Sequence, residues 1–420
     1  MALYTHTHTH TDEFSRRKIV VYVLVFCVLV VVVGIFVSKG KTIKRISGVA
    51  SENIYALDLS EDGAKADDVS VLSEDGGAIL EESEVSDTSN WDLTKVDIVY
   101  DTEGIAVPVP KGYVASGADG EHTVNTGFVI YEGDGEVTTE NAWDESCTRN
   151  QWVWVPVPDV SRIYEIDSNG KKKSKLYTYT ETGRSIYKNN SYEPGILTGY
   201  DNEKYFSRCK IQGMTRDKLL YDLQKEFNFM IESIEKYGGF YIGRYETGNL
   251  KSLEPVVQRM QDTRSVDNTW YAEYTRMQFM GASANVKTSM IFGCLWDETL
   301  QWLIDTGNKT YADMKDSTSW GNYNNATFEY MTTNGTMTTK SKNSNGLAVR
   351  TGSTEYTNAN NIYDLAGGGK AEFILEGNGY NRRSVRSGNY GDTGSNGPAS
   401  VRRNVDPDLS SGARAYLYIK

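Results

Sequence analysis

A run of nineteen apolar residues, Ile19 to Val37, constrains this chain more than any other feature of its sequence. The run carries no charge and is bounded by Lys18 and Lys39. At about 1.5 Å per helical residue it spans roughly 30 Å, which is the thickness of a bilayer core. A secretory signal peptide has a shorter apolar core and a small-residue cleavage site after it, and no such site follows here. The sequence therefore predicts one uncleaved transmembrane helix over residues 19–37.

Basic residues flank the apolar run on both sides, so the charge pattern does not decide the orientation of the chain. Arg16, Arg17 and Lys18 precede the run, and four basic residues follow it between positions 39 and 45. The positive-inside rule therefore gives no clear answer. We adopt the orientation that is usual for a single N-terminal anchor, with residues 1–18 as an inner tail and the C-terminal bulk outside the cell.

An acidic linker, residues 38–95, follows the predicted anchor. Between positions 52 and 92 it holds thirteen Asp or Glu and a single basic residue, Lys65. Such a segment repels itself and has too little apolar surface to bury, so we expect an extended, disordered stalk. Calcium loading is an alternative use of so many carboxylates, but the regular ligand spacing of an EF-hand loop is missing.

The net charge of the whole chain is −12 at neutral pH. A nucleic-acid-binding surface needs an excess of basic residues to displace counterions from phosphates, so we expect no nucleic-acid partner. The chain has four cysteines, of which Cys27 lies in the apolar run. Cys147 and Cys209 are candidates for a disulfide outside the cell, and free, partly buried thiols are the alternative.

Residues 96–420 carry the patterns of a folded domain. Short runs that alternate Val, Ile, Tyr or Trp between Gly and Pro predict strands. The predicted strands are Val96–Tyr100, Ile105–Pro110, Gly127–Tyr131, Gln151–Val157, Gly238–Gly248 and Ala415–Ile419. Apolar residues at helical spacing predict helices over Asp217–Lys236 and Cys294–Asp305. We expect a solvated turn at Lys171–Lys175 and loops over residues 306–360, and the separation of strands from helices indicates an α+β fold.

Five short motifs follow one another along this domain. They are GGFYIGRYETG at Gly238–Gly248, LWDETLQW at Leu295–Trp302, NIYDLAG at Asn361–Gly367, RSGNY at Arg386–Tyr390 and GAR at Gly412–Arg414. In this order they resemble the strand, helix and loop signatures of the formylglycine-generating enzyme and sulfatase-modifying-factor family. The resemblance covers about residues 96–420 and implies a C-type-lectin-like fold of the elaborated kind found in that family.

The catalytic groups that this resemblance implies are missing from the sequence. The generating enzyme oxidises its substrate with a pair of cysteines near its C-terminus, whereas this chain has no cysteine after Cys294. Relatives that use non-haem iron need several histidines, and only His122 lies beyond the N-terminal tail. The family segment that helps to hold a structural calcium is replaced here by GGGKAEF, Gly367–Phe373. We therefore expect no catalytic cofactor, and a structural calcium stays open.

The end of the chain has an unusual composition. From Asn378 to Lys420 it holds six arginines interleaved with Tyr, Asn, Asp, Ser and Gly. Changes at the adenines of asparagine codons give much the same set of residues, and in this respect the region resembles the variable region of proteins targeted by diversity-generating retroelements. Tyr gives rigid contact area and Arg gives bidentate hydrogen bonds, as in antibody paratopes. We therefore interpret residues 367–420 as a ligand-binding region; ordinary polar turns of a loop-rich family member are the alternative.

The residues that we expect to contact a ligand are Tyr380, Arg382, Arg383, Tyr390, Asp392, Asn396, Arg402, Asn404 and Asp406. Arg386, Gly388, Gly412 and Arg414 match the family framework, so we expect them to hold the scaffold. The sequence thus predicts a membrane-anchored protein of the bacterial cell surface that is not an enzyme and binds an extracellular protein or glycan. A sulfatase-modifying-factor-type oxidase and a structural component of cell-envelope or phage origin are the alternatives.

Overall fold

The computed structural model describes residues 88–187, 215–250, 254–264, 269–281, 283–342, 345–377, 382–409 and 411–420. The chain divides into two units, Met1–Ile79 and Leu80–Lys420, and all described residues belong to the second. The predicted tail at 1–18, the predicted anchor at 19–37 and most of the predicted linker at 38–95 lie outside the described residues. Within the described ranges, no helix is long and apolar enough to cross a membrane.

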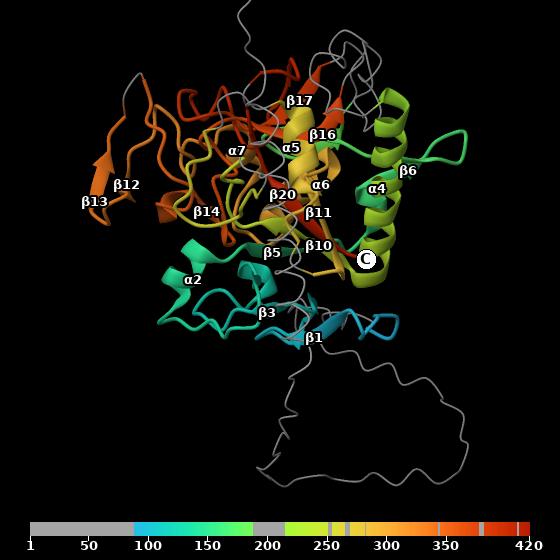
Figure 1. Cartoon of the computed structure of the whole chain (residues 1–420). Coiled ribbons are helices and arrows are strands. Elements are labelled where there is room, and N and C mark those ends of the chain that lie inside the picture. Colours follow the sequence, from blue (N-terminus) through green and yellow to red (C-terminus); the bar gives the residue numbers. More distant parts are fainter. Residues whose placement is uncertain are drawn as a thin grey trace, which may run out of the picture. The chain divides into compact units, whose positions relative to one another are not determined.

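The described unit combines helices with several small antiparallel sheets, so its fold is mixed α/β (Figure 1). The helices are α2 (Ala142–Thr148), α4 (Arg216–Tyr237), α5 (Trp270–Met277), α6 (Gly293–Asp305) and α7 (Tyr311–Lys315). The strands of the first half are β1 (Val96–Tyr100), β2 (Ala106–Pro110), β3 (Tyr113–Ala115), β4 (Val129–Glu132), β5 (Gln151–Pro156), β6 (Tyr164–Ile166), β7 (Lys172–Ser174), β8 (Tyr177–Tyr179), β9 (Arg184–Ile186) and β10 (Gly239–Gly243). Those of the second half are β11 (Val286–Met290), β12 (Phe328–Met331), β13 (Met337–Lys340), β14 (Asn358–Ala359), β15 (Ile362–Tyr363), β16 (Glu372–Gly377), β17 (Arg383–Arg386), β18 (Arg402–Val405), β19 (Gly412–Ala413) and β20 (Ala415–Ile419).

The largest sheet has six strands in the order β11-β20-β10-β5-β4-β3, and every neighbouring pair is antiparallel. The strand at the end of the sequence, β20, lies inside this sheet between β10 and β11 (Figure 1). Leu417 of β20 is paired with Tyr241 of β10 on one side and with Thr288 of β11 on the other. The last strand is therefore a structural part of the core.

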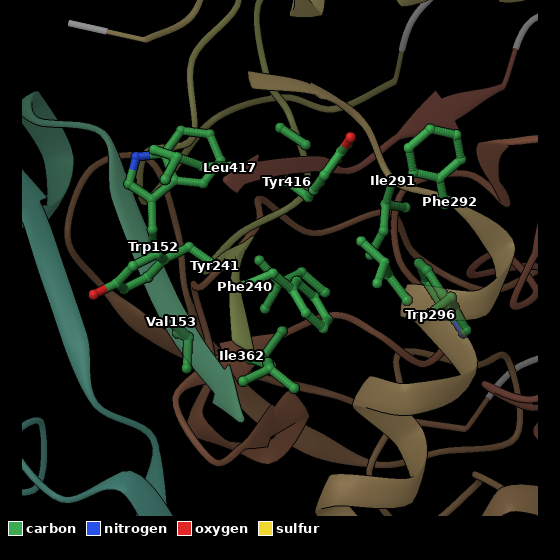
Figure 2. Packing of buried hydrophobic residues seen from close by; sticks show 14 of the residues in the cluster. Trp152, Val153, Phe240, Tyr241, Ile291, Phe292, Trp296, Ile362, Tyr416 and Leu417 are labelled. Atoms are coloured by element: carbon green, nitrogen blue, oxygen red, sulfur yellow. The ribbon is translucent and has the colours of Figure 1, made fainter. Parts of the chain in front are cut away.

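Apolar side chains cover both faces of this sheet (Figure 2). On one face, the Phe292 ring lies 5.5 Å from that of Tyr416 and 5.3 Å from that of Phe227 on α4. On the other face, the Tyr241 ring lies 4.9 Å from that of Trp154, and its hydroxyl donates to the carbonyl of Pro108 on β2. With both faces buried, the sheet forms a rigid base for the segments that follow it.

Helix α4 shows why the sequence pattern predicts its position well. Its N-cap, Thr215, accepts a hydrogen bond from the backbone N–H of Lys218 at 3.2 Å. Its C-cap, Gly238, has φ of 82°, a left-handed conformation that glycine adopts without strain. Between these caps, the apolar stripe from Leu219 to Ile234 is buried against the large sheet.

A second sheet of four strands, in the order β18-β17-β16-β19, holds most of the C-terminal region. β17 and β18 are antiparallel, with Arg383 opposite Val405 and Arg386 opposite Arg402. The segment that connects them, residues 387–401, is called the connecting loop below. The chain then returns through the parallel pair β16–β19 and continues into β20.

Most of the predicted elements are confirmed within one or two residues at each end, including the two long helices and the terminal strand. The expected strand Gly238–Gly248 is shorter, since β10 ends at Gly243. The expected turn at Lys171–Lys175 is wrong, because Lys172–Ser174 forms β7 and pairs with β6. Residues 306–360 are also more ordered than expected, since they contain α7 and the β12–β13 hairpin. Cys147 has a free thiol, and Cys209 lies outside the described residues.

Candidate ligand-binding face

The predicted contact residues occupy three different places around the β17–β18 pair. Tyr380 lies outside the described residues. Arg382 and Asp406 flank the open end of the pair and lie 3.4 Å apart. At the other end of the pair, the connecting loop holds three predicted contact residues, Tyr390, Asp392 and Asn396. The two strands themselves hold Arg383, Arg402 and Asn404. The β17–β18 pair is four residues long, so its two ends are about 13 Å apart. The predicted contact residues therefore do not form one cluster.

The two arginines on the strands are buried and already have partners. Arg402 donates to Asp297 at 2.9 Å, and its Nε lies 2.8 Å from a carboxylate oxygen of Glu376. Arg383 is 1% exposed and donates to the hydroxyl of Tyr271 at 2.6 Å. Its guanidinium also lies over the ring of Trp270. These contacts hold the strands in place, so Arg383 and Arg402 are not part of an accessible face in this structure.

Asp297 on α6 is the centre of this buried network. One of its carboxylate oxygens accepts from Arg386 at 2.7 Å, and the other accepts from Arg402 at 2.9 Å and from the backbone N–H of Tyr177 at 2.8 Å. The Asp297 side chain has no exposed surface. Removing one partner of a buried ion pair costs about 3–5 kcal/mol, because the other charge is left without compensation. Asp297 therefore joins α6 to β17, to β18 and to the start of β8.

Three of the four residues expected to hold the scaffold, Arg386, Gly388 and Arg414, are buried in close contacts. At Gly412 a Cβ would meet nothing nearer than 3.5 Å, so the space there does not require glycine. Arg414 donates to both carboxylate oxygens of Glu372, at 2.9 and 3.0 Å, and is fully buried. Arg386 is fully buried against Asp297. At Gly388, a Cβ would lie only 2.8 Å from the carbonyl oxygen of Gly397, so the loop closes there without room for a side chain.

The N-terminus of helix α6 lies against a carboxylate from the second sheet. Its N-cap, Phe292, makes no side-chain capping bond. The carboxylate of Glu376 lies against the first turn, so close that a Cβ at Gly293 would be 2.2 Å from one of its oxygens. A negative charge at this end of a helix is favoured by the helix dipole. Glycine at position 293 is thus required by the approach of β16 to α6.

The connecting loop is fixed by hydrogen bonds along its length. It begins at Ser387, which has φ of 63° and whose hydroxyl accepts from the N–H of Gly367. The N–H of Tyr390 donates to the carbonyl of Gly368 at 3.0 Å. Asp392 accepts from the N–H of Asn389 at 3.0 Å and from Arg403 at 3.0 Å. The loop is therefore held to the core although it has no regular secondary structure over much of its length.

The accessible side chains of this loop are polar and aromatic. Asn396 is exposed, and Tyr390 and Asp392 are half-buried. An amide, a phenol and a carboxylate offer donors, acceptors and one flat apolar surface for a ligand. We call these three residues, together with Arg264 and Asp262, the candidate face.

Arg264 and Asp262 were missed by the sequence analysis. Arg264 donates to Asp262 at 2.6 Å, and both side chains are about half exposed. The pKa of Arg264 is raised mainly by its hydrogen bond and charge interaction with Asp262, and the hydroxyl of Tyr390 adds to the effect. Arg264 also lies close to the backbone that Tyr390 is bonded to, since a Cβ at Gly369 would be 3.6 Å from its side chain and the N–H of Tyr390 donates to the carbonyl of Gly368. No local pattern in the DTR stretch signals this proximity.

The buried side chain of Glu246 packs under the backbone next to the candidate face and contacts Gly369 and Thr263. Its carboxylate accepts from the N–H of Gly369 at 3.0 Å and from the hydroxyl of Thr263. A Cβ at Gly368 would lie 1.9 Å from one of its oxygens, so glycine is needed where the backbone passes over it. Burial raises the pKa of Glu246 to about 8, and the nearby Glu372 and Asp364 add to this shift. The raised pKa favours the protonated form of Glu246 in the folded protein.

The described residues offer little to a metal ion. They contain no group of three or more His, Cys, Asp or Glu side chains placed to hold one. In Gly367–Phe373, where the family resemblance places part of a calcium site, the one carboxylate is Glu372, and both of its oxygens accept from Arg414. The carboxylate of Glu372 is thus already occupied by Arg414 in this structure.

Comparisons of the chain with protein-family models, with curated proteins and with solved structures found no match.

The pKa of Glu246 gives a test of how the candidate face is supported. Because this pKa is raised in the folded state, the stability linked to protonation is present at low pH and is lost as pH rises from about 4.5 to about 8. Glu246→Gln keeps the shape but cannot ionise, so at pH 9 the variant should be more stable than the unchanged chain by at least about 1 kcal/mol. Urea unfolding at pH 5, 7 and 9 measures this difference.

The matched control is Glu329→Gln, which alters an exposed glutamate on β12 and should follow the curve of the unchanged chain. Parallel pH curves for the Glu246→Gln variant and the unchanged chain would contradict the assignment of a buried, protonated Glu246.

Proposed function

We propose that this chain is a membrane-anchored, surface-displayed binding protein whose contact surface is the candidate face. The anchor in this proposal is the predicted helix at residues 19–37. The observation that carries the proposal is the construction of the connecting loop, whose accessible side chains stand on a backbone fixed by buried hydrogen bonds and ion pairs. A loop that is already ordered loses less conformational entropy when it binds, so affinity comes at a lower cost.

The chemistry of the face supports recognition of a polar macromolecule. Tyr390 gives a flat contact that loses little side-chain entropy, and Asn396, Asp392 and Arg264 give directional hydrogen bonds. These residue types suit an extracellular protein or a glycan, both of which present many polar groups. Non-enzymatic binding is part of the proposal, because the sequence lacks the cysteine pair and the histidines that the family resemblance would require.

The proposal includes the C-type-lectin-like scaffold, and one contact supports it. Three stretches that carry the family resemblance meet at Arg414, which donates to the carbonyl of Gly243 at 2.9 Å and to that of Tyr363 at 2.8 Å. Gly243 belongs to the GGFYIGRYETG stretch, Tyr363 to NIYDLAG and Arg414 to GAR. Arg414 thus joins three motifs that are distant in the sequence, as expected if they form one structural framework.

Binding by the candidate face is tested with the full-length protein on arrays of glycans and of bacterial surface proteins. We expect that a Tyr390→Ala/Asn396→Ala variant loses at least tenfold in affinity for any ligand that the unchanged chain retains, as truncated interface residues do. Tyr100→Ala removes an equally aromatic but unrelated side chain, which is 60% exposed, and should bind as the unchanged chain does.

Equal binding by all three proteins would exclude the candidate face. Formation of formylglycine on a cysteine-containing sulfatase peptide by the purified protein would favour the oxidase alternative instead.

Diversification by a retroelement is the second part of the proposal, and it makes a positional prediction. Among sister isolates, adenine-directed codon changes should fall on accessible positions such as Tyr390, Asp392 and Asn396. Arg386 and Arg414 should be constant, because each is paired with a buried carboxylate. Sequencing the 3′ end of the gene in such isolates measures this pattern. Changes spread equally over buried and accessible positions, or none at all, would contradict it.

A further inference from the structure

A cavity of about 560 Å³ lies between α4, α5 and the end of β20. In Figure 1 the C-terminus of the chain is drawn beside the lower end of α4, and Lys420 at that terminus lines the cavity. No residue of the connecting loop or of the candidate face lines it. Its volume falls in the range of roughly 300–1,000 Å³ that is typical of small-molecule sites. The cavity is thus a separate concave surface of suitable size for a small ligand.

Aromatic rings form much of the wall of this cavity. Phe229 and Tyr237 come from α4, Tyr274 from α5 and Tyr418 from β20. Phe229 is 47% exposed, so its ring is accessible from the cavity. Four rings from three different elements line this one cavity. They favour a ligand with a flat, apolar ring system, which can stack on one of them or contact another edge to face.

Lysines surround the aromatic wall, and several of them have no acidic partner. Lys225 lies over the ring of Phe229 at 5.6 Å, and Lys236 lies over that of Tyr237 at 5.2 Å. Lys287 is half-buried, and burial lowers its pKa. Among the described residues, no carboxylate forms a salt bridge with any of these three ammonium groups. Lys95 and Lys420 also line the cavity.

The carboxylates of the cavity do not cancel this charge. Five lysines line it, against Asp222, Glu226 and Glu232. One of the five, Lys95, lies 3.6 Å from a carboxylate oxygen of Asp92 and donates to the main-chain oxygen of Lys420, so it does not add to the surplus. Asp222 pairs with Lys218, which lies outside the cavity. Glu226 is buried, accepts hydrogen bonds from the hydroxyls of Tyr274 and Tyr416, and has a raised pKa because of its burial. The surplus of positive charge favours an anion.

One buried polar group in the wall also lacks a partner. Ser233 is 5% exposed, and its hydroxyl makes no hydrogen bond to any described residue. A buried hydroxyl without a partner costs about 1–3 kcal/mol. A ligand oxygen in the cavity would satisfy it.

We propose that this cavity binds a small aromatic anion, with its ring against the aromatic wall and its carboxylate beside one of the rim lysines, Lys225 or Lys236. The hydroxyl of Ser233 donates a hydrogen bond to the bound anion. This site is independent of the candidate face and of whatever macromolecule that face contacts.

Calorimetric titration of the full-length protein, held in a neutral detergent, with 2-naphthoate tests the site. We expect saturable binding at one site, no binding of acetate, which lacks the ring, and at least tenfold weaker binding of 2-naphthylmethylammonium, which has the opposite charge. A Lys225→Glu/Lys236→Glu variant should bind 2-naphthoate at least tenfold more weakly. Lys315→Glu, which changes an exposed lysine on α7, should leave the affinity unchanged.

Ser233→Ala separates a binding role from a purely structural one. Because it removes an unsatisfied hydroxyl, it should raise the thermal midpoint of the free protein while weakening 2-naphthoate binding. The proposal is overturned if 2-naphthoate does not bind at millimolar concentration, if the cationic analogue binds equally well, or if the double lysine variant keeps full affinity. Loss of candidate-face binding would leave these results unaffected, so the two sites are tested separately.

Discussion

The buried carboxylate of Asp297 is the interaction on which the C-terminal third of this protein depends. It neutralises the guanidinium groups of Arg386 and Arg402 and also caps the backbone N–H of Tyr177. Each of these charges would cost several kcal/mol if it were buried alone. Their mutual compensation lets two polar strands pack against α6. In the same way, Glu372 neutralises the buried guanidinium of Arg414 at the point where the chain returns to the large sheet.

This mode of packing explains how a region rich in Gly, Asn, Asp and Arg can be ordered. The β17–β18 pair buries few large apolar side chains and is instead fixed by charge-assisted hydrogen bonds, which are directional. Directional bonds set the position of the strands, and the strands set the position of the connecting loop. A ligand surface on that loop is therefore held in a fixed position by the buried ion pairs of the two strands.

Local patterns in the sequence were sufficient for the elements that are held by apolar burial. The stripe of α4, its Thr215 and Gly238 caps and the alternating residues of β20 can each be read from a few neighbouring positions. Pairing between distant charges cannot be read in this way, since Arg402 and Asp297 are 105 positions apart. For this reason Arg383 and Arg402 were assigned to the ligand surface, whereas the structure buries them. The proximity of Asp262 and Arg264 to the connecting loop was missed for the same reason.

The molecule thus offers two surfaces of different chemistry. The candidate face is a loop with exposed polar groups and suits a large partner, whereas the cavity beside α4 has aromatic walls and a cationic rim and suits a small anion. The large sheet supports both, because β20 contributes Tyr418 to the cavity and continues directly from Arg414.

Hydrogen–deuterium exchange of the full-length protein tests the central claim, that the C-terminal residues form an ordered framework and not a flexible tail. Amides in paired strands exchange only when the strands open, so exchange reports the stability of each element. The account predicts that peptides from β16, β17, β18 and β20 are protected nearly as strongly as those from β10. Exchange of β17 and β18 at the rate of an unfolded chain, with β10 still protected, would contradict it.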